Sequence, residues 1–305
     1  MDIKDKVKGG LYGVAVGDAL GATLEFMGRD IVEERYGVLT DIIGGGWLKL
    51  APGEWTDDTE MTLAVAEGIA RVPHDPINTI GEEFLRWYKT GPKDVGTTCA
   101  AVFNKVRRGL SWHQAACQLH AETAHTAGNG ALMRTLPVAL AYPKLEDVVE
   151  KARQIAQMTH WDERAALTCQ LYCLTAYFLT AGEDLHQSLD SARLYLTQHL
   201  KNIEPFVHMW TELTCKMSKP EPTGYTVDTL ACALWALQST CTLEEAVISA
   251  VNLGGDADTV GAITGGLAGV CYGLAAIPER WVEKFSSEQR ERLDSVAERL
   301  LAVRS

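Results

Sequence analysis

The sequence predicts a single all-α domain over residues 1–305. Most segments place apolar residues at helical spacing between helix start and stop signals, and alternating strand-like stretches are nearly absent. Two segments also repeat glycine at every fourth position. The hydrophobic content of 47% and the charged content of 22% are ordinary for a globular protein. The length is sufficient for one large hydrophobic core.

The glycine repeats predict two central helices. Glycine weakens a helix interior by about 1 kcal/mol relative to alanine, so a repeat on one face indicates that two backbones approach closely there. We therefore expect the two segments in the centre of the domain, packed against each other. The repeated positions are Gly9, Gly13, Gly17 and Gly21 near the start of the chain, and Gly261, Gly265, Gly269 and Gly273 near its end.

The second glycine segment lies in an uncharged run, 260–277, whose length suits a membrane-spanning helix. The run is rich in glycine and alanine, so its hydropathy is weak, and no basic cluster flanks it. We expect a buried helix and no integral membrane segment.

The other predicted helices follow from capping residues and apolar spacing. Thr56 is expected to cap one helix, and Asp75 a second, with Pro76 at its first helical position. The segment 28–54 is expected to be irregular. The predicted helices cover 55–72, 75–91, 132–140, 145–160, 162–182, 226–238, 242–255 and 286–303.

Charge and cysteine content limit the function classes. A net charge of −12 argues against a general nucleic-acid binder, which needs basic surface. The eight cysteines form no CxxC pair, and the N-terminus shows no export signal, so free thiols and a cytoplasmic location are expected. For the oligomeric state we expect a monomer.

Two short acidic segments are the strongest chemical signals. Thr56-Asp57-Asp58-Thr59-Glu60 and Asp256-Ala257-Asp258-Thr259 each place carboxylates and a threonine hydroxyl at a helix start. Helix capping explains either segment alone. If both segments converge, their carboxylates repel one another, and divalent cations are the natural counter-charge. Hard oxygen ligands favour Mg²⁺, Mn²⁺ or Ca²⁺, and a shared carboxylate suits two ions, which together activate water.

Other motifs leave alternatives open. The segment from Asp256 imitates the start of an EF-hand loop but lacks its later ligands, and no P-loop or nucleophile elbow occurs. Asp57-Asp58-Thr59-Glu60 also fits the magnesium motif of helical terpene synthases, although their second motif is missing. The glycine-containing loops 93–98 and 127–131 could hold an anion at a helix start. On spacing alone, ordinary turns and caps are the better interpretation of both loops.

Taken together, the motifs resemble the ADP-ribosylglycohydrolase family. The segments that carry the resemblance are, in order, GDALGATLEF, GEWTDDTEMT, AGNGALMR and GGDADTVGAITGGLAG. The shorter segments GGGWLKL, DVG and LPVALA make the chain most similar to the family's dinitrogenase reductase-activating glycohydrolases, which remove ADP-ribose from arginine. The resemblance extends from about residue 9 to residue 281.

The resemblance implies an all-helical fold with two Mg²⁺ or Mn²⁺ ions. It assigns Thr56, Asp57 and Asp58 to one ion, and Asp256 and Thr259 to the other, with Asp258 bridging them. Glu25 matches an acidic residue that approaches the metals in relatives, and it is grouped here with the substrate-binding residues.

The resemblance also implies a substrate site and a reaction, the hydrolysis of the N-glycosidic bond between ADP-ribose and arginine. Asp94 would handle protons, with Asp58 and Asp258 as the other catalytic residues. Gly96 and the loop Gly128, Asn129 and Gly130 would bind substrate, the loop at its diphosphate. His160 and Tyr225 match positions that line the ADP-ribose cleft.

Alternatives remain at this stage. A relative could instead cleave serine-linked or O-acetyl ADP-ribose, or could bind ADP-ribose without catalysis, although all metal-ligand positions are occupied here. Thr97 stands where similar relatives would carry an acid, which affects the expected substrate preference. The expected partner is an ADP-ribosylated protein of unknown identity, with ADP-ribose as product.

Overall fold

The computed structural model describes residues 1–305 and is all-α, as predicted. It contains no β-strand, only two isolated β-bridges. No helix is long and apolar enough to span a membrane. The α-helices are α1 (Ile3–Gly21), α2 (Arg29–Tyr36), α3 (Asp57–Arg71), α4 (Ile77–Tyr88), α5 (Thr97–Arg107), α6 (Trp112–Thr123), α7 (Leu136–Ala141), α8 (Leu145–Ala156), α9 (Glu163–Ala181), α10 (Leu185–His199), α11 (Glu204–Met217), α12 (Thr226–Gln238), α13 (Leu243–Val251), α14 (Ala257–Tyr272), α15 (Glu279–Val282) and α16 (Ser287–Arg304).

Two short 3₁₀-helices complete the fold, η1 (Leu132–Arg134) and η2 (Leu274–Ala276). The chain forms two compact units that interleave along the sequence. Unit 1 comprises 1–60, 213–224 and 228–298, and unit 2 comprises 61–212, 225–227 and 299–305. The single domain expected over 1–305 stays a prediction.

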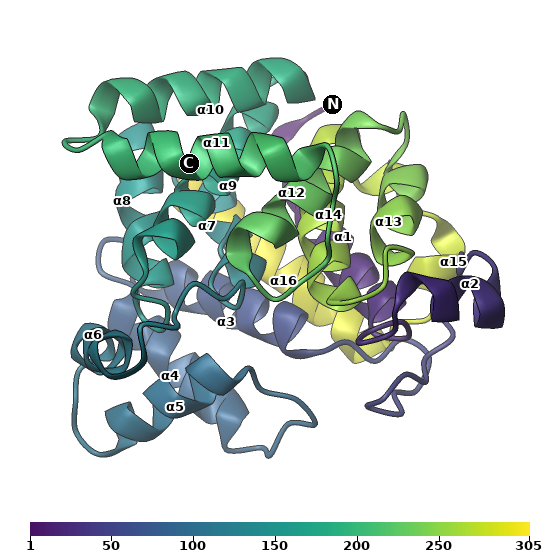
Figure 1. Ribbon diagram of the computed structural model, residues 1–305, viewed down its shortest axis with the longest axis horizontal. Coiled ribbons are helices and arrows are strands. Elements are labelled where there is room, and N and C mark those ends of the chain that lie inside the picture. Colours follow the sequence, from purple (N-terminus) through teal and green to yellow (C-terminus); the bar gives the residue numbers. More distant parts are fainter. The chain divides into compact units, whose positions relative to one another are not determined.

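Unit 1 is built on the antiparallel contact of α1 with α14, the two predicted glycine helices (Figure 1). A Cβ atom added at Gly13 would lie 2.0 Å from the carbonyl oxygen of Gly265, and one at Gly17 would lie 2.0 Å from that of Gly261. Only glycine permits this backbone contact, because a side chain would overlap the opposite helix. The predicted packing of the two glycine segments is thereby confirmed.

Unit 2 is centred on α9, whose residues are buried along almost the whole helix. Helices α7, α8 and α10 pack against it (Figure 1). Asp162 caps α9 by accepting a hydrogen bond from the backbone N–H of Arg164, and Gly182 ends the helix in the left-handed conformation. Cys169 and Cys173 are both buried free thiols of this helix, as the sequence analysis expected for the cysteines.

Three sequence predictions need correction. Residues 28–54 are not wholly irregular, since α2 lies within them. Pro76 is the N-cap of α4 rather than its first residue, and Asp75 precedes the cap. The predicted helix 132–140 is split into η1 and α7, because Pro137 has no backbone N–H to donate to the carbonyl of Met133 and its ring clashes with the preceding turn.

Candidate active site

The two acidic segments meet in unit 1. The hydroxyl of Thr259 donates a hydrogen bond to Asp58 Oδ2 over 3.2 Å, and the hydroxyl of Thr56 donates to the same oxygen over 3.3 Å. Carboxylate oxygens of Glu25, Asp256 and Asp258 lie within 4.8 Å of one another. The start of α3 and the start of α14 therefore form one site, 201 residues apart in sequence.

We call these carboxylates the acidic cluster: Asp18, Glu25, Asp57, Asp58, Asp256 and Asp258. All but Asp256 are buried, and Asp256 is half-buried. Burial raises the pKa of Asp58 well above its ordinary value, and the neighbouring carboxylates raise it further. The pKa of Asp258 is raised for the same two reasons. Such a cluster is electrostatically costly without a cation.

Two observations fit this cluster to metal ions. Oδ1 of Asp58 is buried and has no hydrogen-bond partner in the protein, although buried carboxylate oxygens are nearly always paired. Asp256 occupies the N-cap position of α14, yet its side chain makes no capping hydrogen bond. Helix capping therefore does not explain Asp256. The donor set consists of carboxylate and hydroxyl oxygens, which suits Mg²⁺, Mn²⁺ or Ca²⁺.

Asp18 is a site residue that the sequence analysis did not single out. It is fully buried in α1 and accepts hydrogen bonds from the backbone N–H groups of Thr56 and Thr59 and from the Thr59 hydroxyl. Burial raises its pKa to about 6, against the lowering effect of these bonds. Asp18 thus fixes the start of α3. The available signal was its position as the only charged residue between Leu11 and Leu24.

The AGNGA loop, residues 127–131, lies in unit 2, where it contacts two other predicted substrate-binding residues, Tyr225 and His160. Gly128 pairs with Tyr225 in an isolated antiparallel bridge, and the N–H of Thr226 donates to the carbonyl of Ala127 over 3.0 Å. A Cβ atom at Gly130 would lie 3.0 Å from Cε1 of His160. The structure therefore brings the loop, His160 and Tyr225 together.

Arg134 donates hydrogen bonds to the loop and to its neighbours, and it is a second residue that the sequence analysis did not single out. Its buried guanidinium donates to the carbonyl of Gly130 over 2.6 Å and to the hydroxyl of Thr159 over 2.7 Å. The Thr159 hydroxyl lies 2.8 Å from Nδ1 of His160. The Thr159 hydroxyl can accept from Arg134 and also donate to Nδ1, an arrangement in which a neutral imidazole carries its hydrogen on Nε2.

His160 is held in this neutral form. Burial, with a smaller contribution from the charge of Arg134, lowers the pKa of His160 to about 3. The side chain is therefore an N–H donor beside the glycines of the AGNGA loop, rather than a cation.

Asp94 and Gly96 lie in the unit 2 loop that precedes α5. Asp94 is half-buried, and Gly96 is the N-cap residue of α5. Tyr225 stacks under the guanidinium of Arg164 at 5.5 Å, and its hydroxyl donates to Glu212 over 3.0 Å. Burial, the largest of several effects, raises the Tyr225 pKa to about 12, so its hydroxyl stays protonated.

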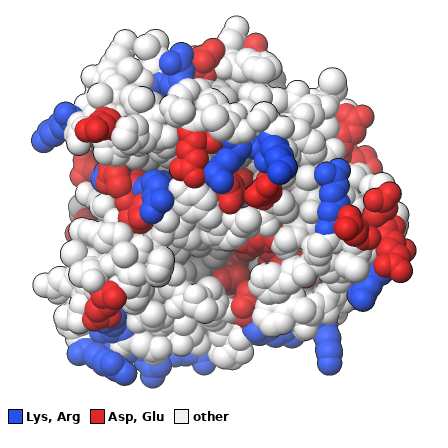
Figure 2. Space-filling view, in the orientation of Figure 1, with Lys and Arg blue, Asp and Glu red and all other residues white.

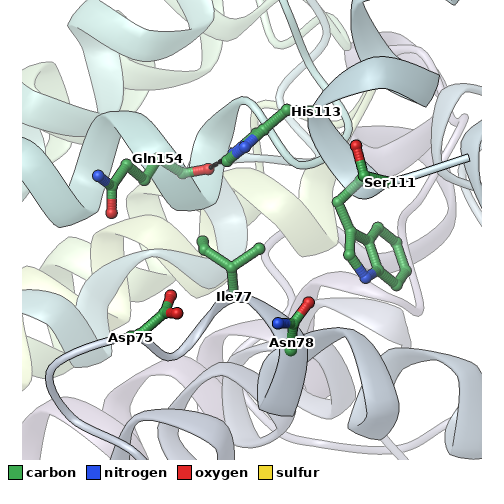
Figure 3. A pocket seen from close by; sticks show the side chains of 7 residues that line it. Asp75, Ile77, Asn78, Ser111, His113 and Gln154 are labelled. Atoms are coloured by element: carbon green, nitrogen blue, oxygen red, sulfur yellow. Dashed lines mark hydrogen bonds between the residues drawn. The ribbon is translucent and has the colours of Figure 1, made fainter.

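A separate cavity in unit 2, of about 270 Å³, contains none of the predicted site residues. Figure 3 shows its lining from the start of α4, the start of α6 and α8, with the ring of His113 bonded to the carbonyl oxygen of Gln154. The cavity holds no cluster of carboxylates. Figure 2 shows acidic and basic side chains interspersed over one face of the molecule, without a continuous basic surface on that face.

Comparisons with known proteins show which family the chain resembles. The family profile described as ADP-ribosylglycohydrolase matches residues 1–305. An ADP-ribosyl-[dinitrogen reductase] glycohydrolase of Rhodospirillum rubrum is 35% identical, over 99% of this chain and 97% of its own. The ADP-ribosylarginine hydrolase Tri1 of Serratia proteamaculans is 33% identical, over 97% of this chain and 79% of its own.

A solved structure titled ADP-ribosylglycohydrolase-related protein complex superposes with a TM-score of 0.80 at 30% identity, covering 100% of this chain and 99% of its own. A more distant relative, the human ADP-ribosylhydrolase ARH3, is 25% identical over 82% of this chain. The match over the whole length, the shared fold and the converged acidic segments lead to one conclusion: this chain is a member of the ADP-ribosylglycohydrolase family.

Proposed function

We propose that this glycohydrolase is metal-dependent and removes ADP-ribose from ADP-ribosylated arginine on a target protein, reversing mono-ADP-ribosylation. The observation that carries the proposal is the joining of the two acidic segments through the Thr259–Asp58 hydrogen bond. This contact brings oxygen ligands from both segments into one buried cluster. The family membership supplies the reaction class, and the relative named as an ADP-ribosylarginine hydrolase favours arginine as the linkage.

The proposed metal ligands are those the motifs suggested. Thr56, Asp57 and Asp58 would hold one Mg²⁺ or Mn²⁺ ion, and Asp256 and Thr259 a second, with Asp258 between them. Glu25 belongs with this group by position, since its carboxylate lies with those of Asp256 and Asp258. When bound, the ions would supply positive charge that acidifies water and stabilises developing negative charge.

The side chains of unit 2 have proposed roles in binding and proton transfer. Asp94 would accept and return the proton that moves during N-glycosidic bond cleavage. The glycines Gly96, Gly128 and Gly130 would leave their backbone N–H groups accessible to the diphosphate, as glycine-rich helix starts do. His160 would donate from Nε2, and Asn129 and Tyr225 would contact the ADP-ribose.

A second candidate keeps the family reaction and changes the bond to serine-linked or O-acetyl ADP-ribose. The human relative ARH3, whose name specifies no linkage, matches at lower identity than the relative named for arginine. A non-catalytic ADP-ribose reader is disfavoured because every proposed ligand position carries an oxygen side chain. We further propose that the protein acts in the cytoplasm as a monomer.

One experiment separates these candidates. ADP-ribose release is measured from an arginine-ADP-ribosylated protein and from a serine-linked one, with Mg²⁺ or Mn²⁺ and then with EDTA. We expect metal-dependent release from arginine and at least about a tenfold lower rate from serine, the change that about 1.4 kcal/mol in the barrier produces. Release from serine alone would overturn the arginine assignment, and binding of ADP-ribose without any release would favour the reader.

A further inference from the structure

Two aromatic side chains of unit 1 stand exposed beside the acidic cluster. Phe26 is 68% exposed and Trp47 is 48% exposed. Their ring centroids lie 5.4 Å apart at an interplanar angle of 46°. We call this pair the aromatic platform. Large exposed aromatic side chains that contact each other commonly belong to binding surfaces.

The backbone at Phe26 is held in a conformation that disfavours its side chain. Its φ of 61° is in the left-handed region, which large side chains rarely adopt. The N–H of Phe26 donates to the carbonyl of Gly255 over 2.6 Å, and the N–H of Gly255 donates to the carbonyl of Met27 over 2.8 Å. These bonds fix Phe26 between Glu25 and the segment that leads into Asp256. Asparagine would fit this φ at lower cost, so the phenyl ring needs another reason.

Trp47 is fixed by independent contacts. Its indole N–H donates to Oε2 of Glu25 over 2.5 Å. The turn that carries it is closed by the Gly45–Leu50 bridge. A Cβ atom at Gly46 would lie 2.3 Å from the carbonyl oxygen of Ala22, so the turn lies directly on the end of α1. The indole ring is therefore positioned before any ligand arrives.

The negative charge beside the platform favours cationic ligands over anionic ones. Glu25, which holds Trp47, lies with Asp256 and Asp258. With all six carboxylates of the acidic cluster ionised, two bound divalent ions would leave two negative charges in excess. An anionic group such as a diphosphate would be repelled at this position, whereas a planar cation gains from both the carboxylates and the ring faces.

We propose that the Phe26–Trp47 platform binds the guanidinium of the ADP-ribosylated arginine and thereby selects the arginine linkage. A guanidinium that carries ribose on one nitrogen remains planar and cationic, so it can stack on the indole face. This inference rests on the proposed function and adds the recognition of the leaving group to it.

The test compares two variants with two controls. Trp47→Ala and Phe26→Asn each remove one ring, and the asparagine suits the left-handed backbone. Trp47→Phe keeps a ring at position 47, and Val38→Ala truncates another exposed apolar side chain of unit 1, 61% exposed. For each protein, kcat/KM is measured on an arginine-ADP-ribosylated peptide, the dissociation constant for free ADP-ribose by calorimetry, and Tm by calorimetric unfolding.

We expect Trp47→Ala and Phe26→Asn to lower kcat/KM by about 3- to 30-fold, the range of a partly desolvated cation–π contact. ADP-ribose lacks the guanidinium, so its dissociation constant should change by less than about twofold. Trp47→Phe should recover most of the loss, because Phe still offers a ring face. Phe26→Asn should keep or raise Tm while lowering activity, which a purely structural role would not produce. Val38→Ala should match the wild type.

Unchanged kcat/KM in both ring-removal variants of an active enzyme would overturn the platform and leave the proposed function intact. Equal losses for the peptide and for ADP-ribose would place the rings on the ADP-ribose portion and overturn the guanidinium assignment. If the wild type does not hydrolyse the peptide, the proposed function is wrong. The platform is then tested by measuring binding of the intact peptide to the wild type and to Trp47→Ala. Equal affinity of the two proteins for the peptide, or no binding by either, would overturn the platform.

Discussion

Buried polar groups have opposite electrostatic environments in the acidic cluster of unit 1 and in the AGNGA loop region of unit 2. In the cluster, burial and like charges raise the pKa of Asp58 and Asp258 well above ordinary values. Around the loop, Arg134 donates to carbonyl and hydroxyl oxygens, and His160 is held neutral as a donor. The first region gathers buried like charges that a cation would offset, whereas the second consists of hydrogen-bond donors. The comparison therefore separates a cluster of carboxylates from a region of N–H groups.

The largest expected effect comes from removing a carboxylate of the cluster. Asp58→Asn or Asp258→Asn should lower ADP-ribose release by about 10³-fold or more, since a metal contributes several kcal/mol to transition-state stabilisation. Asp58→Asn should nevertheless be more stable than the wild type in EDTA, because it removes like-charge repulsion. Release assays and unfolding in EDTA check both expectations. Full activity in either variant would refute the metal assignment.

The next effect concerns the α1–α14 contact that supports the cluster. Gly17→Ala places a Cβ atom 2.0 Å from the carbonyl oxygen of Gly261. The helices must separate, and we expect a loss of about 3 kcal/mol or more in the free energy of unfolding. Gly28→Ala is the matched control, since nothing lies within 4 Å of its added Cβ. Urea denaturation measures both, and equal stability of the two variants would contradict the close contact.

Removal of bound metal should make the stability of the protein depend on pH through the carboxylates of the acidic cluster. In the metal-free protein the raised carboxylate pKa values, such as about 6 for Asp18, mean that the folded state binds more protons than the unfolded state. Its stability should therefore fall as pH rises from about 4 through the raised pKa values. We expect EDTA-treated protein to lose at least about 1 kcal/mol between pH 5.5 and pH 8. Denaturation at both pH values, with and without Mg²⁺, checks this, and a loss that Mg²⁺ does not reduce would refute it.

The fourth expected effect belongs to His160 and has the opposite sign. Its folded pKa of about 3 lies below the ordinary value of 6.5, so the unfolded state binds the extra proton below pH 6.5. Stability is then lost as pH falls, by about 1.4 kcal/mol at pH 5.5. His160→Gln should lack this part of the pH dependence. Urea denaturation at pH 7.5 and 5.5, compared between the two proteins with Mg²⁺ present, measures it, and identical pH dependence would contradict a buried neutral His160.

The sequence by itself determined the all-α fold and its two central helices, because helical periodicity and a glycine at every fourth position are local patterns. It also indicated the two acidic segments, since Asp57, Asp58, Asp256 and Asp258 stand at recognisable helix starts. Helix boundaries were less secure, as the break between η1 and α7 at Pro137 shows, because a proline can either start a helix or interrupt one.

Only the tertiary structure decided which groups meet. The Thr259–Asp58 bond, the support of α3 by Asp18, and the contact of Arg134 with Thr159 join residues distant in sequence. Spacing along the chain carries no information about such contacts, which depend on how the helices pack. The same holds for Phe26 and Trp47, since exposure and ring contact are properties of the folded surface rather than of the sequence pattern.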